Sequence, residues 1–264
     1  MLQQTQVERV AAAYERFLVA FPSFPALAAA PRADVVRAWK GLGYNLRAVR
    51  LHELARAVTE RYGGLLPSES QALLALPGIG AYTAGAIRAF AFDLDDVAID
   101  VNVRRVVHRL RFGIEYPPCT TAAELDGTAR ELLPPGEGHR WNSALMDLGA
   151  GVCKALAPRC DTCPVRTWCA AARHGSTRIG EAAKQRRKHR SRGPQSRLPF
   201  EQTKRYLRGR ILDRLREAPA GVMLAAADLV AASAAGPRYS LEEILGGLER
   251  DGLIVRDASG IKLR

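Results

Sequence analysis

The chain of 264 residues is 47% hydrophobic, which is enough for one large domain and a small second one. Its start, MLQQTQVERV, has no apolar signal core, and no stretch approaches the roughly 18 apolar residues of a membrane span, so we expect a cytoplasmic protein without a membrane partner. Lys and Arg number 39 against 27 Asp and Glu, a formal charge of +12 that favours nucleic acid as a partner, although a solvated basic surface gives the same composition.

Helical periodicity dominates the first two thirds of the chain. Apolar residues share one helical face in three stretches: Val7, Val10, Tyr14, Phe17 and Leu18, then Leu51, Leu54, Ala55 and Val58, then Val103, Val106, Val107 and Leu110. Ser68 and Gln71 have the spacing of a capping box before a further apolar run. No strand alternation appears before Pro199, so this part is predicted to be all-α.

The hairpin motif Leu76-Pro77-Gly78-Ile79-Gly80 lies between two of the predicted helices. Gly78 and Gly80 permit a tight turn, and backbone N–H groups at the start of the next helix then point at a phosphate. An ordinary turn between antiparallel helices is the alternative interpretation of the motif alone.

Five cysteines in a chain without an export signal argue against disulfides. Four of them form C-x6-C-x2-C-x5-C, namely Cys153, Cys160, Cys163 and Cys169. Zinc sites usually use two short pairs, whereas only Cys160 and Cys163 are that close, so the wide outer spacing favours an iron–sulfur cluster over zinc or four free thiols. Cys119 stands apart and is interpreted as a buried apolar cysteine.

Residues 173–200 lose periodicity and carry the run KQRRKHRSR, which predicts a basic linker that either tracks phosphates or is a solvated segment. Beyond it, Leu207, Ile211 and Leu215 predict one helix, and the capping pair Ser240 and Glu243 opens another. The last residues, LIVRDASGIKLR, predict a β-hairpin. Residues 201–264 are therefore expected to form a small winged-helix-like module.

Taken in order, MLQQTQV, WKGLGYN, LPGIGAYTAGAI, IDVNVRRV, WNSALMDLGAGVC and the cysteine array resemble the MutY and endonuclease III superfamily of helix-hairpin-helix DNA glycosylases over residues 1–172. The resemblance implies an all-α fold with a six-helix part at about 1–107 and an iron–sulfur part at about 108–172. It implies a [4Fe-4S] cluster on the four cysteines and a monomer that binds double-stranded DNA containing a mispair. LQQTQ and GLGY are similar to the MutY branch.

The resemblance also implies two catalytic residues. Asp100 matches the family's catalytic aspartate, which stabilises the positive charge that develops on the sugar, although a helix N-cap is an alternative role that is compatible with catalysis. Tyr82 matches a position that contacts the reacting nucleotide, with helix packing as the alternative. Bifunctional members carry a Lys at this position, so strand cleavage through a Schiff base is not expected.

Three further residues match DNA contacts of the family. Gln3 and Gln4 match the LQQTQ segment that penetrates the duplex beside the lesion; otherwise they are solvent-exposed polar residues. Tyr44 matches the aromatic wedge of the GLGY loop, with a half-buried loop tyrosine as the alternative. The family often has a second aromatic residue next, where this chain has Asn45.

Two departures from the family pattern affect the expected activity. The family places a glutamate that protonates adenine two residues before the segment that here begins at Met1, so we expect an upstream start and loss of base excision without it. Many MutY proteins also carry a Nudix-like domain that recognises 8-oxoguanine, whereas residues 201–264 are too short and too helical for one.

The sequence therefore predicts a monofunctional glycosylase that removes adenine mispaired with 8-oxoguanine or guanine. A thymine glycosylase for T·G mismatches and a non-catalytic iron–sulfur DNA-binding protein are the alternatives.

Overall fold

A computed structural model describes residues 1–2, 5, 7–113, 120–173, 184, 199–230 and 239–264. Contacts divide the chain into two compact units. The first contains residues 1–66, 76–78 and 195–264, and the second contains residues 67–75 and 79–194. Among the described residues, no helix is long and apolar enough to cross a membrane.

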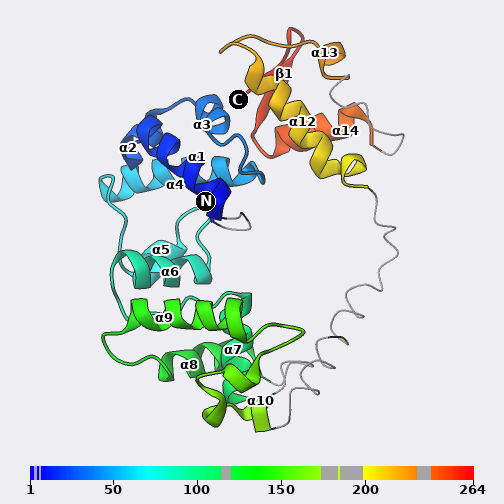
Figure 1. Ribbon diagram of the computed structural model, residues 1–264. Helices are drawn as coiled ribbons and strands as arrows, with labels where there is room; N and C mark the ends of the chain where they lie inside the picture. Colours follow the sequence, from blue (N-terminus) through cyan, green and yellow to red (C-terminus); the bar gives the residue numbers. More distant parts are fainter. Residues whose placement is uncertain (3–4, 6, 114–119, 174–183, 185–198, 231–238) are drawn as a thin grey trace. The chain divides into compact units, whose positions relative to one another are not determined.

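The first unit begins with four helices (Figure 1), which are α1 (Val7–Ala20), α2 (Phe24–Ala29), α3 (Arg32–Ala38) and α4 (Leu46–Tyr62). Val10, Ala13 and Phe17 of α1 pack into a core around Trp39. The face predicted for α1 is partly wrong, because Val7, Tyr14 and Leu18 are exposed. The face predicted for α4 is confirmed, with Leu54, Ala55 and Val58 buried.

The C-terminal segment belongs to this first unit. It contains η4 (Phe200–Gln202), α12 (Lys204–Glu217), α13 (Ala226–Val230), α14 (Leu241–Arg250), β1 (Ile254–Asp257) and β2 (Gly260–Leu263). The capping box predicted at Ser240 and Glu243 is confirmed, and the two strands pair antiparallel from Ile254↔Leu263 to Asp257↔Gly260, as the predicted hairpin requires. Leu207, Ile211 and Leu215 are buried together with Val36 of α3 and Val49 of α4.

The second unit is helical throughout its described part. It contains α5 (Ser70–Leu74), α6 (Ala81–Ala91), α7 (Val101–Arg111), α8 (Ala122–Glu131), α9 (Gly138–Asp147), the π-helical η1 (Leu148–Val152), the 3-10 turns η2 (Cys160–Thr162) and η3 (Arg166–Trp168), and α10 (Ala170–Arg173). Helix α7 contacts α8, α9, η1 and α10, so it is the central element of this unit (Figure 1).

Two caps in this unit differ from expectation in an instructive way. The capping box predicted at Ser68 and Gln71 is wrong, because α5 begins after Glu69, which makes no side-chain cap, while the Ser68 carbonyl accepts a hydrogen bond from Arg88. A capping box that was not predicted forms at Thr121 and Glu124. The prediction of an all-α fold with a small C-terminal α+β module is confirmed. The predicted linker, residues 173–200, lies mostly outside the described residues, so these domain limits remain predictions.

Candidate active site and cysteine site

Asp100 is the N-cap residue of α7, and its carboxylate accepts hydrogen bonds from the first turn of the helix. Oδ1 accepts hydrogen bonds from the backbone N–H groups of Asn102 at 2.8 Å and Val103 at 2.7 Å. Oδ2 accepts one from the Asn102 side-chain amide at 2.9 Å. The carboxylate is therefore a helix cap of fixed orientation, and a carboxylate with about four acceptor positions still has capacity for a further partner.

Tyr82, in the first turn of α6, lies within electrostatic reach of this carboxylate. Its side chain is 39% exposed. Partial burial raises the pKa of the Tyr82 phenol, and the charge of Asp100 raises it further. The second unit thus brings together the two residues predicted to be catalytic, and the phenol stays protonated as a hydrogen-bond donor at neutral pH.

The hairpin motif before α6 has the turn geometry that its glycines predict. Gly78 has a φ of +79°, which L-residues other than Gly rarely adopt, and an added Cβ would lie 3.2 Å from the Cβ of Arg50. Gly80 is the N-cap residue of α6 and has no side chain to bond the first N–H groups of the helix. Those N–H groups therefore point outward from the helix start, an arrangement that binds anions.

The GLGY loop belongs to the first unit, between α3 and α4. Tyr44 is 42% exposed and has a φ of +45°, an unusual value for a non-glycine residue. Arg47, in the first turn of α4, donates hydrogen bonds to the carbonyl oxygens of Leu42 at 2.9 Å and Gly43 at 3.3 Å and to that of Met1 at 2.7 Å. Its guanidinium therefore connects the loop to the start of the chain. Gln3 and Gln4 themselves lie outside the described residues.

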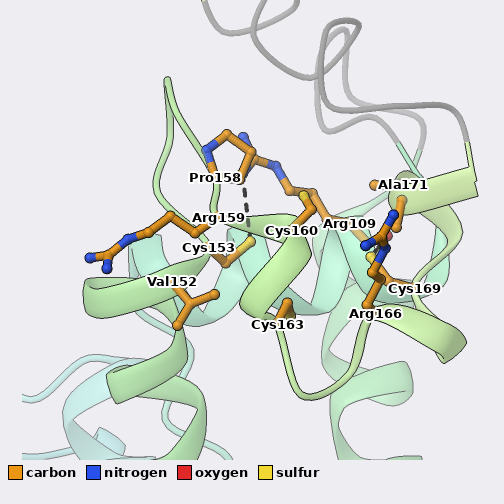
Figure 2. Close-up of a pocket in the computed structure, with 11 residues that line it drawn as sticks. Arg109, Val152, Cys153, Pro158, Arg159, Cys160, Cys163, Arg166, Cys169 and Ala171 are labelled. Carbon is orange, nitrogen blue, oxygen red and sulfur yellow. Dashed lines mark hydrogen bonds between the residues drawn. The ribbon is translucent and has the colours of Figure 1, made fainter.

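The four cysteines of the array line one hollow (Figure 2). Cys153 follows η1, Cys160 begins η2, Cys163 follows η2 and Cys169 follows η3, so the π-helical turn and the two 3-10 turns place one thiol after another around the hollow. In the described part of the chain, no three His, Cys, Asp or Glu side chains converge closely enough to hold a single metal ion.

Two arginines of α7 fix the loop that carries these thiols. Arg109 is 2% exposed and donates to the carbonyl oxygens of Lys154 and Ala155, each at 2.9 Å. Its Nη1 also lies 3.6 Å from the Cys153 sulfur, the contact drawn as a dashed line in Figure 2. Arg105 donates to the carbonyl oxygens of Cys153 and Gly149, each at 2.7 Å. The loop is thus bound to α7 through its main chain.

The thiols stand in each other's electrostatic field. Burial raises the pKa of the Cys160 thiol, and its three neighbours in the array raise it further, against a smaller lowering by Arg109. Burial likewise raises the pKa of Cys163. These shifts favour the neutral thiols of Cys160 and Cys163, so a cationic centre would be needed to hold all four groups as thiolates. An all-sulfur donor set around a hollow suits an iron–sulfur cluster. The residues present therefore fit such a group.

Comparison with known proteins agrees with these features. The HhH-GPD superfamily of base excision DNA repair proteins matches residues 1–135. An adenine DNA glycosylase of Mycolicibacterium smegmatis is 39% identical over 262 residues, which are 98% of this chain and 83% of that protein. The chain belongs to the HhH-GPD superfamily. The resemblance inferred from the motifs, and the class of base-excision DNA glycosylase that it implies, are confirmed.

Two further proteins are similar over about two thirds of the chain. An adenine DNA glycosylase of Mus musculus is 42% identical over 173 residues, which are 65% of this chain and 34% of that protein. The structure of a thermostable thymine-DNA glycosylase aligns with a TM-score of 0.61 and 32% identity, covering 66% of this chain and 80% of that one. The similarity to the mycobacterial relative, by contrast, extends through the C-terminal module.

Sequence reasoning missed the arginines that hold the two loops of this HhH-GPD protein. Arg105 and Arg109 are four residues apart on a helix whose other buried residues are Val103, Val106, Val107 and His108. Charged residues among mostly apolar buried positions were therefore the available signal. Arg47 lies next to the GLGY motif and was not singled out.

Proposed function

We propose that this chain is a monofunctional adenine DNA glycosylase that acts on adenine mispaired with 8-oxoguanine or guanine. The observation that carries the proposal is the Asp100 carboxylate, fixed by two backbone N–H groups beside the Tyr82 phenol, in a chain whose relatives are named adenine DNA glycosylases. The opposite base is inferred from the motif resemblance.

The proposed reaction is hydrolysis of the bond between the sugar C1′ and adenine N9. The acid that protonates adenine is the glutamate that the family resemblance places before Met1. As the bond breaks, its electron pair leaves with the protonated base, and positive charge develops on the sugar. Asp100 stabilises that charge and orients a water molecule, whose oxygen bonds C1′ and whose proton leaves to solvent. Tyr82 donates a hydrogen bond to the flipped nucleotide. The products are free adenine and an abasic site, and no amine forms a covalent intermediate.

DNA is the proposed partner, and five residues are assigned to it. The helix start behind Gly78 and Gly80 binds a phosphate, Tyr44 stacks between bases, and Gln3 and Gln4 contact the bases that remain after flipping. The formal charge of +12 supports this assignment. The monomeric state and the cytoplasmic location remain predictions.

Cys153, Cys160, Cys163 and Cys169 are the proposed ligands of a [4Fe-4S] cluster. When bound, the cluster supplies a structural cross-link between the segments that carry the four thiols, and hydrolysis needs no electron from it. Arg105 and Arg109 hold the loop backbone in place for these ligands.

The test separates the catalytic role of Asp100 from its role as a cap. Asn is an equally good cap, so Asp100→Asn keeps the bonds from the backbone N–H groups of Asn102 and Val103. It loses the bond from the Asn102 side-chain amide, so it costs about 1 kcal/mol of stability. Both proteins, wild type and Asp100→Asn, carry the upstream extension that supplies the expected glutamate, and loss of the Asp100 charge lowers single-turnover adenine release by about 100-fold to 1,000-fold. Release within about threefold of the extended wild type would contradict a catalytic Asp100.

The same assay decides between substrates. Duplexes containing A·8-oxoguanine and T·G are compared for the 264-residue chain and for a chain extended through the upstream codons. The thymine glycosylase alternative rests on the 32% identity to a thymine-DNA glycosylase structure, and release of thymine would establish it. Adenine release with strand breaks only after alkali treatment supports our proposal, and tight binding without release from either chain would indicate a DNA-binding protein.

A further inference from the structure

Tyr44 is in a conformation that its own loop does not favour. It is a non-glycine residue at a φ of +45°, and its ring is 42% exposed. A left-handed backbone conformation is unfavourable for residues with a Cβ, so we expect contacts from elsewhere in the chain to stabilise Tyr44 in it. One such contact comes from 161 residues further along the chain.

Arg205, in the first turn of α12, binds the tyrosine in two ways. Its Nη1 donates a hydrogen bond to the Tyr44 hydroxyl at 2.9 Å. Its Cζ lies 4.1 Å from the centre of the Tyr44 ring, closer than Arg47, whose Cζ is 5.7 Å away. A guanidinium at this distance is attracted to the ring by the cation–π effect. Both the ring and its hydroxyl are therefore held by one side chain of the C-terminal module.

The same helix also binds the next residue of the loop. Arg216, near the end of α12, donates to the Asn45 side-chain oxygen at 2.8 Å and to the Val36 carbonyl at 3.1 Å. The Arg216 side chain is 5% exposed. The residue that follows Tyr44 is thus an amide that fits a buried arginine of the C-terminal module. Helix α12 therefore binds two consecutive residues, Tyr44 through Arg205 and Asn45 through Arg216.

These contacts come from a helix that is packed into the core of the first unit. Thr203 caps its N-terminus, and Leu207, Ile211 and Leu215 are buried in the core that includes Val36 and Val49. We propose that the C-terminal module positions Tyr44 for insertion into DNA, with Arg205 as the positioning residue. This inference rests on the proposed DNA-stacking role of Tyr44.

Positioning differs from a plain phosphate contact in what it predicts. A phosphate contact by Arg205 would strengthen DNA binding whether or not Tyr44 is present, and the two losses would add. A positioning contact acts only through Tyr44, so removing Arg205 from a chain that already lacks the ring has little further effect. In the free protein, a positioning contact between Arg205 and Tyr44 also orders the GLGY loop.

The first measurement needs no substrate. Hydrogen exchange of the peptide covering residues 40–46 is compared in free wild-type protein, Arg205→Ala and Arg210→Ala. Arg210 is the matched control, since it is an exposed arginine of the same helix for which the structure gives no contact among the described residues. We expect exchange in this peptide to be at least fivefold faster in Arg205→Ala and unchanged in Arg210→Ala. Unchanged exchange in Arg205→Ala would overturn the proposal.

The second measurement uses a mispaired duplex with 2-aminopurine beside the mispair, whose fluorescence rises when the wedge unstacks it. Wild type, Arg205→Ala, Tyr44→Ala and the double variant are compared. We expect Arg205→Ala to lose about tenfold in apparent affinity of the fluorescent, unstacked complex, Arg205→Lys to recover part of it, and the double variant to equal Tyr44→Ala. Additive losses would overturn the proposal in favour of an independent phosphate contact.

Base release is followed in parallel on the same variants, with the wild type and each variant made in the chain extended through the upstream codons. If wild type unstacks DNA but releases no base, the proposed glycosylase function fails while the fluorescence cycle still decides the positioning role. If wild type releases adenine and Arg205→Ala does so at the wild-type rate with wild-type unstacking, the positioning role fails while the glycosylase function stands.

Discussion

The cysteine loop (residues 148–169) and the GLGY loop (residues 41–44) are both held by arginines, but in opposite ways. Arg105 and Arg109 reach the cysteine loop from one central helix, are almost fully buried, and bond main-chain oxygens. The GLGY loop receives Arg47 from the adjacent helix and Arg205 from the C-terminal module, and it keeps an exposed aromatic ring. The first loop is thus fixed by a single helix, whereas the second also depends on a segment of its unit that is 161 residues away in the sequence.

The difference shows which loop tolerates change. Hydrogen bonds from a buried charged group to carbonyls are costly to remove because both partners lose water and each other. A partly exposed guanidinium loses less, since solvent replaces its bonds. We therefore expect substitutions in the cysteine loop to act on stability and those in the GLGY loop to act on positioning.

The largest expected effect is on the cysteine array. Cys163→Ser removes one of the four proposed ligands, so purified protein should contain less than about a tenth of the wild-type iron, and its second unit should melt at a markedly lower temperature. Iron content, visible absorbance and circular dichroism measure this. Cys119→Ser, outside the array in the sequence, is the matched control and should keep the iron. Full iron in Cys163→Ser would contradict the ligand assignment.

The next effect is on the anchor of that loop. Arg109→Met keeps the length of the side chain but leaves the carbonyls of Lys154 and Ala155 without this donor, so we expect a loss of about 3 kcal/mol of unfolding free energy. Urea unfolding measures it. Arg111→Met, an exposed position at the end of the same helix, should change stability by less than about 0.5 kcal/mol. Equal effects of the two substitutions would remove the distinction between the two loops.

The sequence predicted the fold better than it predicted these anchors. Periodicity found the buried faces of α4, α7 and α12 because those helices bury a simple apolar stripe. It placed the wrong residues inward on α1, where Val7 and Tyr14 are exposed. Caps failed at Ser68 because a local spacing does not say which polar group a distant arginine will bind.

The candidate site shows the same difference between residues in local motifs and residues whose partners are distant in the sequence. Asp100 in IDVNV was singled out through the family resemblance and the four cysteines through their spacing, because such motifs lie within short stretches of sequence. The structure places the Asp100 carboxylate on its neighbouring N–H groups and the four cysteines around one hollow, while their roles stay predictions. Arg205 was not found, because its partner is 161 residues away and nothing in the helix KRYLRGR marks one arginine among several. Long-range pairing of this kind is specified by packing of the whole unit.

Of the substitutions that compare the cysteine loop with the GLGY loop, Arg47→Met is expected to have the smallest effect on the free energy of unfolding. Arg47→Met removes donors to Thr5, Leu42 and Gly43, but the guanidinium is only partly buried, so water replaces part of the lost bonding and the cost is about 1–2 kcal/mol. Burial also lowers the pKa of Arg47, which shows that its charge already pays a desolvation cost that methionine does not.

We expect Arg47→Met to change the mobility of the GLGY loop more than it changes the stability of the fold. Without Arg47 the GLGY loop loses its link to the start of the chain, so hydrogen exchange in residues 40–46 should rise even though Arg205 still binds Tyr44. Arg56→Met, at an exposed position of the same helix, is the matched control for urea unfolding and exchange. If Arg47→Met proved as costly as Arg109→Met, the GLGY loop would be a rigid part of its unit, and it would not need the C-terminal module to hold Tyr44.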